Sequence, residues 1–261
     1  MMIMLKRLLL VFFLATATMR ATAGSYTDIW YNPAEPGWGV NLVESDNFLF
    51  ATFFIYGQNG SPTWYTAQLT WDGSKFTGGL YATGGTWFAA PWQPGNWSVA
   101  QAGTASFQPS SVNAYQGTLI YTVNGLGTVS KAIERQTLTT IGLGGSYTGG
   151  QSGAYSGCSN SANNGSYIDR YDLNVTHLAG ISATFQFLYT SGTVCTLSGT
   201  LVQYGQLYRI PNATYQCSSG LNTAATVEDI KATALGIEGR FGAASVGGGC
   251  REDAQFSAVL Q

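Results

Sequence analysis

Short runs of alternating apolar residues, each closed by a turn that contains glycine, recur along most of this chain. These turns are Asn59-Gly60, Asp72-Gly73, Asn124-Gly125, Ala179-Gly180, Ser191-Gly192 and Tyr204-Gly205. A period of two predicts half-buried strands, and Asn-Gly or Asp-Gly pairs are typical of hairpin turns. Strands joined by such short connections pair with their neighbours in antiparallel fashion. The chain is therefore predicted to be all-β, with two antiparallel meander units that are each a barrel or a sandwich.

One segment of the second half is ambiguous. Residues 226–233 space Val227 and Ile230 as a short helix would, but the run is brief, and we favour a strand. The overall composition agrees with strands, since the chain has 34 glycines and 13% aromatic residues but only 9% charged residues.

Tryptophan and cysteine divide the chain. All seven tryptophans precede residue 98, and all four cysteines follow residue 157. The two halves are thus expected to be stabilised by different means, which predicts two domains. We place a tryptophan-rich β domain at residues 24–141, a Gly-rich linker at 142–154 and a disulfide-containing β domain at 155–261.

The N-terminus has the features of an export signal. Lys6 and Arg7 precede a short apolar run at residues 8–15, and Ala21-Thr22-Ala23 resembles a cleavage site, so residues 1–23 are predicted to be a signal peptide. No later run reaches about 18 apolar residues, which predicts a protein that does not span the membrane. We expect the protein to be exported, to the periplasm or the extracellular space.

Charge argues against a nucleic-acid partner. The chain has 11 basic and 13 acidic residues, and three of the basic ones, Lys6, Arg7 and Arg20, lie in the predicted signal peptide. The mature chain would therefore have a net charge of −5. Nucleic-acid-binding domains are typically basic, so this class is disfavoured.

The cysteines predict two disulfides. Four cysteines in an exported chain allow three connectivities. If Tyr204-Gly205 is a hairpin turn, Cys195 and Cys217 lie together at its open end, which leaves Cys158 to pair with Cys250. A metal site is not expected, because no two cysteines have the close spacing of zinc ligands, and no cofactor is predicted.

Catalytic signals are scarce. The single histidine, His177, lies in an alternating strand pattern, and neither a nucleophile elbow nor a phosphate-binding glycine loop occurs. Glu35, Glu44 and Asp72 would have to share a cleft to act as a glycosidase pair. No catalytic residue is predicted, and a secreted hydrolase that uses paired carboxylates is the third-ranked function.

The segment from Trp30 to Gly39 is predicted to be a rigid, irregular loop. Pro33 and Pro36 fix the backbone, and Gly37 allows conformations closed to other residues. Its aromatic rings have two alternative roles. They either plug the end of a barrel while Asn32 caps a turn, or they contact a ligand.

This loop, together with residues 50–56 and Pro62-Thr63-Trp64-Tyr65, resembles a module of exported proteins of Gram-negative bacteria. The shared pattern is W-[WY]-N-P-x-E-x-G-W-G followed by an apolar strand, a turn with glycine and P-x-W, and it extends from Ile29 to Leu138. The resemblance implies a fold unit and an exported location. The matching positions are Trp30, Asn32, Glu35, Gly37, Trp38 and Trp64.

These observations favour a non-enzymatic protein that binds an apolar small molecule or a glycan through an aromatic-lined loop end. The candidate ligand-binding residues are Trp30, Asn32, Glu35, Trp87 and Trp92, and the candidate structural residues are Gly37, Trp38 and Trp64. An envelope or surface-interaction protein is the alternative. Avidin-like and lipocalin-like barrels are the nearest analogy in fold, and fold alone identifies no ligand.

Overall fold

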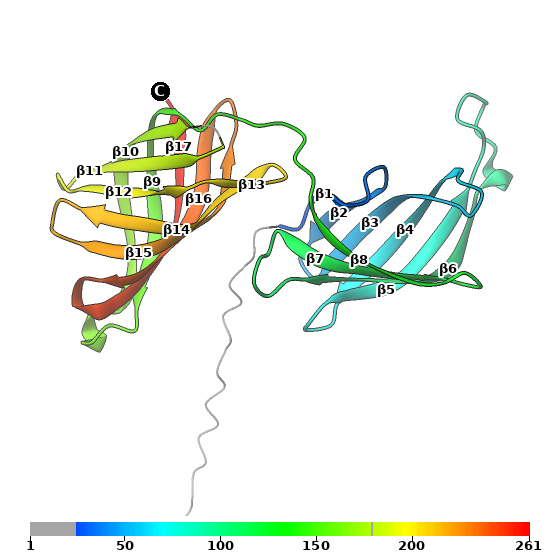
Figure 1. Cartoon of the computed structure of the whole chain (residues 1–261), viewed down its shortest axis with the longest axis horizontal. Coiled ribbons are helices and arrows are strands. Elements are labelled where there is room, and N and C mark those ends of the chain that lie inside the picture. Colours follow the sequence, from blue (N-terminus) through cyan, green and yellow to red (C-terminus); the bar gives the residue numbers. More distant parts are fainter. Residues whose placement is uncertain (1–24, 179) are drawn as a thin grey trace, which may run out of the picture.

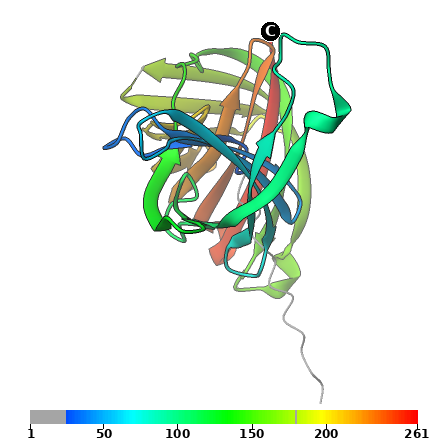
Figure 2. The same ribbon diagram turned by 90° about the vertical axis from the view of Figure 1, so that its right-hand side faces the viewer.

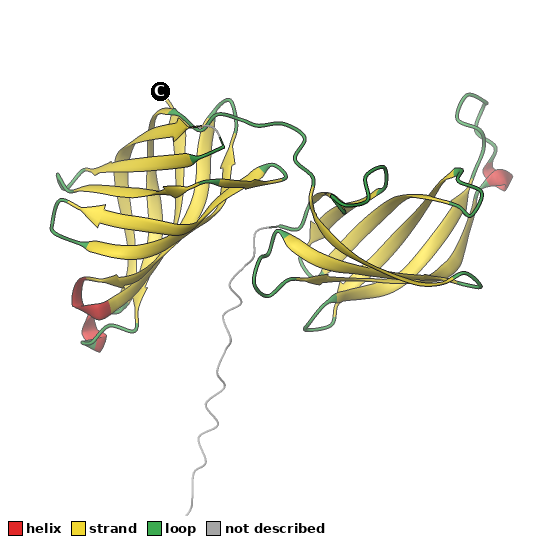
Figure 3. Cartoon of the chain, viewed as in Figure 1, coloured by secondary structure: helices red, strands yellow, loops and turns green. Residues whose placement is uncertain are grey.

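The computed structural model describes residues 25–178 and 180–261, and it confirms the all-β prediction. Strands make up nearly all of the regular structure (Figure 3). Three single-turn 3-10 helices interrupt the loops: η1 (Pro94–Asn96), η2 (Ser161–Asn163) and η3 (Gly247–Gly249). No helix in the described part of the chain is long and apolar enough to cross a membrane. The predicted signal peptide lies outside the described residues.

The first half forms a closed antiparallel barrel of eight strands (Figure 1). They are β1 (Asp28–Tyr31), β2 (Gly39–Ser45), β3 (Phe48–Tyr56), β4 (Pro62–Trp71), β5 (Phe76–Gly84), β6 (Ser98–Pro109), β7 (Gln116–Val123) and β8 (Gly127–Arg135). Each strand pairs with the next, and β1 pairs with β8 to close the ring. Closure leaves no free sheet edge.

Large apolar side chains fill the first barrel. Along β3, Leu49 and Phe53 point inward, while Phe48, Phe50 and Phe54 alternate with them on the outer face. Trp30 from β1 packs edge to face on Phe107, with 5.0 Å between ring centroids. The inner side chains therefore form a hydrophobic core.

The second half is also a ring of paired strands. They are β9 (Gly145–Ser156), β10 (Gly165–Leu178), β11 (Ser182–Tyr189), β12 (Val194–Thr200), β13 (Val202–Tyr204), β14 (Leu207–Cys217), β15 (Asn222–Ala232), β16 (Gly236–Val246) and β17 (Cys250–Leu260). The last strand, β17, pairs with the first, β9, and β12 pairs with β14 in addition to β11. Short β13 extends the edge beside β14. The strand predicted at residues 226–233 is confirmed over residues 226–232, which belong to β15.

The prediction that residues 142–154 form a linker is wrong, because most of them belong to β9. The glycines there permit close strand contact. A Cβ on Gly149 would lie 2.1 Å from the carbonyl oxygen of Ser257 on β17. The connection between the two barrels is the shorter segment 136–144.

Both predicted disulfides, Cys158–Cys250 and Cys195–Cys217, are confirmed. They lie at the same end of the second barrel. In an up-and-down ring, the β9–β10, β11–β12, β14–β15 and β16–β17 connections share one end, and all four cysteines lie in or beside these connections.

The two barrels touch through Tyr115, which precedes β7 and is almost fully buried. Its hydroxyl donates to Oδ1 of Asp229 over 2.8 Å, and the backbone N–H of Asp229 donates to it over 2.7 Å. The Tyr115 ring stacks on Tyr204 at a centroid distance of 5.3 Å. Seen from the side, the first barrel lies in front of the second (Figure 2).

Candidate functional site

The structure corrects one member of the predicted binding loop. The sequence predicted that Trp30 contacts a ligand at the aromatic-lined loop end, but its exposed fraction is 0%. The alternation of β1 turns its indole inward, where the ring N–H donates to the carbonyl of Tyr26 over 3.0 Å. Arg135 covers the ring, with the guanidinium carbon 5.0 Å from the ring centroid. The predicted ligand contact is wrong, and Trp30 belongs to the core.

Asn32 and Glu35 stabilise their own loop. The Asn32 side chain accepts a hydrogen bond from the backbone N–H of Ala34 over 2.9 Å, which closes an Asx turn. Glu35 accepts from Lys131 over 2.6 Å and from the indole N–H of Trp38 over 3.3 Å. The hydrogen bond from Lys131 lowers the pKa of Glu35. Both side chains already have partners within the first barrel.

Trp87 and Trp92 lie in the loop between β5 and β6, with exposed fractions of 69% and 63%. This loop and the β1–β2 loop are at the same end of the ring, because both follow odd-numbered strands of an up-and-down barrel. The structure therefore brings Trp87, Trp92 and Glu35 to one end and separates Trp30 from them.

The three residues predicted to be structural lie in different surroundings. Gly37 has a φ of +107°, a conformation that favours glycine. Trp38 is half-buried and packs against the core. Trp64 is 52% exposed on the outer face of β4, opposite Phe54 of β3.

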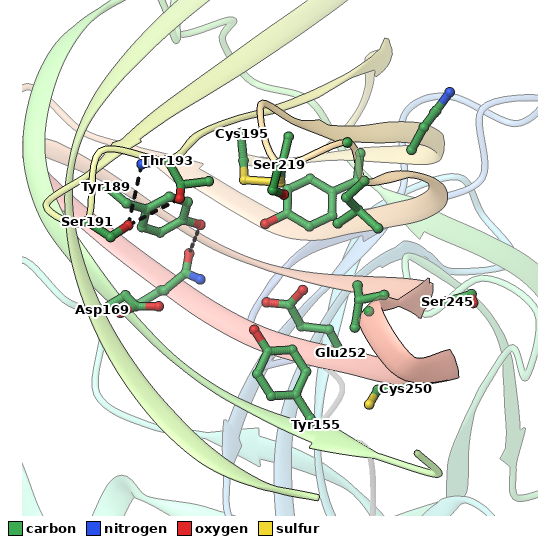
Figure 4. Close-up of a pocket in the computed structure, with 18 of the residues that line it drawn as sticks. Tyr155, Asp169, Tyr189, Ser191, Thr193, Cys195, Ser219, Ser245, Cys250 and Glu252 are labelled. Atoms are coloured by element: carbon green, nitrogen blue, oxygen red, sulfur yellow. Dashed lines mark hydrogen bonds between the residues drawn. A yellow bond between two sulfur atoms is a disulfide. The ribbon is translucent and has the colours of Figure 1, made fainter. Parts of the chain in front are cut away.

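A second candidate site lies at the disulfide-tied end of the second barrel. It is a concavity of about 900 Å³, and both disulfides line it. Inward-facing side chains of five strands form its polar lining: Gln151 and Tyr155 of β9, Asp169 of β10, Tyr189 of β11, Tyr215 of β14 and Glu252 of β17. Figure 4 shows the Tyr155 hydroxyl and the Glu252 carboxylate pointing toward the same central space.

Hydrogen bonds join four residues of this lining into one network through Tyr167: Gln151, Tyr189, Tyr215 and Glu252. Tyr167 donates to Oε1 of Glu252 and accepts from the amide of Gln151 over 3.1 Å. Gln151 in turn accepts from the hydroxyl of Tyr189 over 3.0 Å, and Tyr189 shares a hydrogen bond with Tyr215. The rings of Tyr155 and Tyr167 stack with 4.9 Å between centroids. The pocket is therefore organised before any ligand enters.

Burial controls the charges in this network. Glu252 is 3% exposed, and desolvation raises its pKa, partly offset by the hydrogen bond from Tyr167. Burial raises the pKa of Tyr155 to about 12 and also raises those of Tyr167, Tyr189 and Tyr215. The tyrosines thus remain neutral hydroxyl groups near neutral pH, which can donate as well as accept hydrogen bonds.

Sequence reasoning missed this site. Its residues come from five separate strands, and none of them forms a local motif. One signal was present: Glu252 occupies an inward position between Cys250 and Ala254, where the period of two calls for an apolar side chain. A carboxylate on the buried face of a strand is a candidate for function.

No protein family and no curated protein matches the chain. Among solved structures, a double mutant of the vaccine antigen transferrin binding protein B from Haemophilus parasuis Hp5 is similar at a TM-score of 0.30 and 10% identity, covering 88% of this chain and 67% of that one. Isotype 1 transferrin binding protein B from serogroup B Neisseria meningitidis gives a TM-score of 0.34 and 12% identity, over 90% of this chain and 69% of that one. Intact Ap-TbpB, with N and C lobes, gives 0.32 and 13%, over 88% and 68%.

Proposed function

We propose that this is an exported, non-enzymatic binding protein, and that its ligand is a small carbohydrate held in the tyrosine pocket of the second barrel. The observation that carries the proposal is the convergence of Tyr155, Tyr189, Tyr215, Gln151 and Glu252 in one concavity of about 900 Å³. Ligand pockets in proteins commonly measure about 300–1,000 Å³. The two disulfides are compatible with export.

The polar lining favours a sugar over an apolar molecule. An apolar ligand would displace water from the exposed polar groups of the lining, such as Asp169 and Ser191, without replacing those contacts, which is unfavourable. A sugar offers hydroxyl groups to these side chains and to Ser191 and Thr193 at the rim. Its apolar ring face also suits the faces of tyrosine rings.

Surface interaction is a second candidate function, and a different observation favours it. The outer face of β2, β3 and β4 exposes a row of large apolar side chains: Val43, Phe48, Phe50, Phe54, Tyr56 and Trp64. Clustered apolar residues on an outer surface are typical of protein contacts.

Binding of a glycan panel to the whole mature chain, measured by calorimetry, tests the proposal. We expect Tyr215→Ala to weaken sugar binding by about tenfold or more, which corresponds to the loss of about 1.4 kcal/mol. Trp92→Ala is the matched control in the loop that the sequence favoured. Loss of binding in Trp92→Ala with none in Tyr215→Ala would move the site to the first barrel and overturn the proposal.

A further inference from the structure

All charged side chains that line the tyrosine pocket are acidic. They are Asp169 of β10 and Glu252 of β17, and among residues 25–178 and 180–261 neither a lysine nor an arginine lines the pocket. The nearest basic neighbours along these strands, Arg170 and Arg251, alternate to the outer face, where Arg251 forms an ion pair with Asp253 over 2.7 Å. The pocket interior therefore has an uncompensated negative charge whenever these carboxylates are ionised.

Glu252 lines the pocket, and one of its two carboxylate oxygens accepts a hydrogen bond from a tyrosine. Over the described chain, the hydrogen bond to the Glu252 carboxylate comes from Tyr167 and reaches Oε1. Figure 4 shows the carboxylate projecting into the pocket beside Tyr155. A donor that enters from the open end would thus meet Oε2 of Glu252 in a setting shielded from bulk water, where a charge-assisted hydrogen bond is strong.

Aromatic rings surround the same space. Tyr155, Tyr189 and Tyr215 all line the pocket. The face of an aromatic ring attracts cations within about 6 Å of its centre, and this attraction increases when water is excluded. The tyrosine rings and the carboxylates thus both favour a positively charged ligand group.

We propose that the pocket selects, among sugar-sized ligands, those that have a protonated amine, as an amino sugar does. This inference rests on the proposed function, since it names the ligand class of the same site. The ammonium group donates to Oε2 of Glu252 and lies among the tyrosine rings, while Asp169 near the rim adds a second negative charge. The hydroxyl groups of the sugar meet Gln151, Ser191 and Thr193.

Three disaccharides with the same linkage distinguish the effect of ligand charge on affinity from the effect of ligand shape. Cellobiose is neutral, chitobiose has neutral acetamido groups, and fully deacetylated chitobiose has protonated amines. We expect the deacetylated sugar to bind the whole mature chain at pH 7 about tenfold more tightly than the other two, as measured by calorimetry at low salt. A disaccharide that contains glucuronate should bind more weakly than cellobiose, because its charge has the same sign as the pocket.

Two substitutions test whether the carboxylate of Glu252 causes the preference for the deacetylated sugar. Glu252→Gln keeps the shape of the side chain and one acceptor oxygen but removes the negative charge, and we expect the variant to bind the deacetylated sugar no more than about twofold more tightly than cellobiose. Glu238→Gln, an exposed position on β16 of the same barrel, is the matched control and should change neither affinity.

The outcomes distinguish the two proposals. Equal binding of all three disaccharides, with no effect of Glu252→Gln, would overturn the charge preference and leave the carbohydrate site intact. If no sugar binds, or if binding is unaffected by Tyr215→Ala, the proposed function itself is wrong. Circular dichroism of each variant confirms that the barrels remain folded.

Discussion

Two tryptophans of the first barrel show how burial determines the stability that is lost when one side chain is truncated. Trp30 fills the barrel core, whereas Trp87 projects into solvent. Truncation of a large buried aromatic side chain typically costs about 3–5 kcal/mol, because it removes contacts and leaves a cavity. We expect Trp30→Ala to lose stability in this range in chemical denaturation, and Trp87→Ala to lose less than about 1 kcal/mol. Similar losses in both variants would contradict the packing described here.

The raised pKa of Glu252 predicts how the stability of the folded protein changes with pH. Burial raises its pKa in the folded protein above the ordinary value, and nearby Asp169 and Asp253 act in the same direction. The folded state therefore binds more protons than the unfolded state between these two pKa values, so this group's contribution to stability falls as pH rises through that window. The stabilising contribution of Glu252 is fully present only below the ordinary pKa of a glutamic acid.

Denaturation by urea at several pH values between 4 and 7 tests this sign. We expect the stability of Glu252→Gln relative to the natural chain to increase as pH rises, because glutamine stays neutral. Glu238→Gln is the control, since that side chain is exposed on the same barrel. A constant difference for Glu252→Gln across the pH range would show that the carboxylate has the same pKa in the folded and unfolded chain.

At the scale of elements, β9 is the most informative strand. Its glycines suggested a linker, but they serve strand pairing on both sides. We expect Gly149→Ala to be strongly destabilising, by about 1–3 kcal/mol or more, because the new methyl group would meet backbone atoms of β17. Gly142→Ala is the control, since a Cβ there meets no atom within 4 Å. Equal tolerance of the two substitutions in thermal denaturation would argue against the β9–β17 pair.

Most strands were predictable because their signal is local. Alternation marks residues 38–44, a short run with apolar residues on both faces marks residues 48–56, and short glycine turns fix the order of their neighbours. Pairing between β9 and β17 joins segments at opposite ends of the second half, and no local pattern encodes it. The pocket could not be predicted for the same reason, since Gln151, Tyr189 and Glu252 meet only after the ring closes.

Tryptophan fluorescence separates the two barrels within the whole molecule, because every tryptophan precedes residue 98 and both disulfides lie in the second barrel. A disulfide typically contributes about 2–4 kcal/mol. We expect replacement of Cys158 and Cys250 by serine to lower the stability of the second barrel by about this amount and to weaken sugar binding. The tryptophan emission spectrum of the folded state should not change. A shift of that emission would mean that the disulfide also supports the first barrel.

We expect the relative placement of the barrels to depend on Tyr115. Its hydroxyl both donates to and accepts from Asp229, and the guanidinium groups of Arg135 and Arg209 lie 5.7 and 5.5 Å from its ring centroid. Each barrel has its own hydrophobic core, so this contact is needed for their arrangement rather than for either fold. Tyr115→Phe would remove the hydroxyl that accepts from the partly buried N–H of Asp229, and the loss of a hydrogen bond typically costs about 0.5–1.5 kcal/mol.

Removal of the whole ring tests this role most directly. In Tyr115→Ala, the stack on Tyr204 and the contact with both arginines are lost together. We expect small-angle scattering to show a larger radius of gyration, while sugar binding in the distant pocket changes less than about twofold. Tyr121→Ala, within the core of the first barrel, provides the contrast, since it should lower stability without separating the barrels. An unchanged scattering profile in Tyr115→Ala would show that the connection 136–144 and the remaining polar contacts are sufficient to hold the two barrels together.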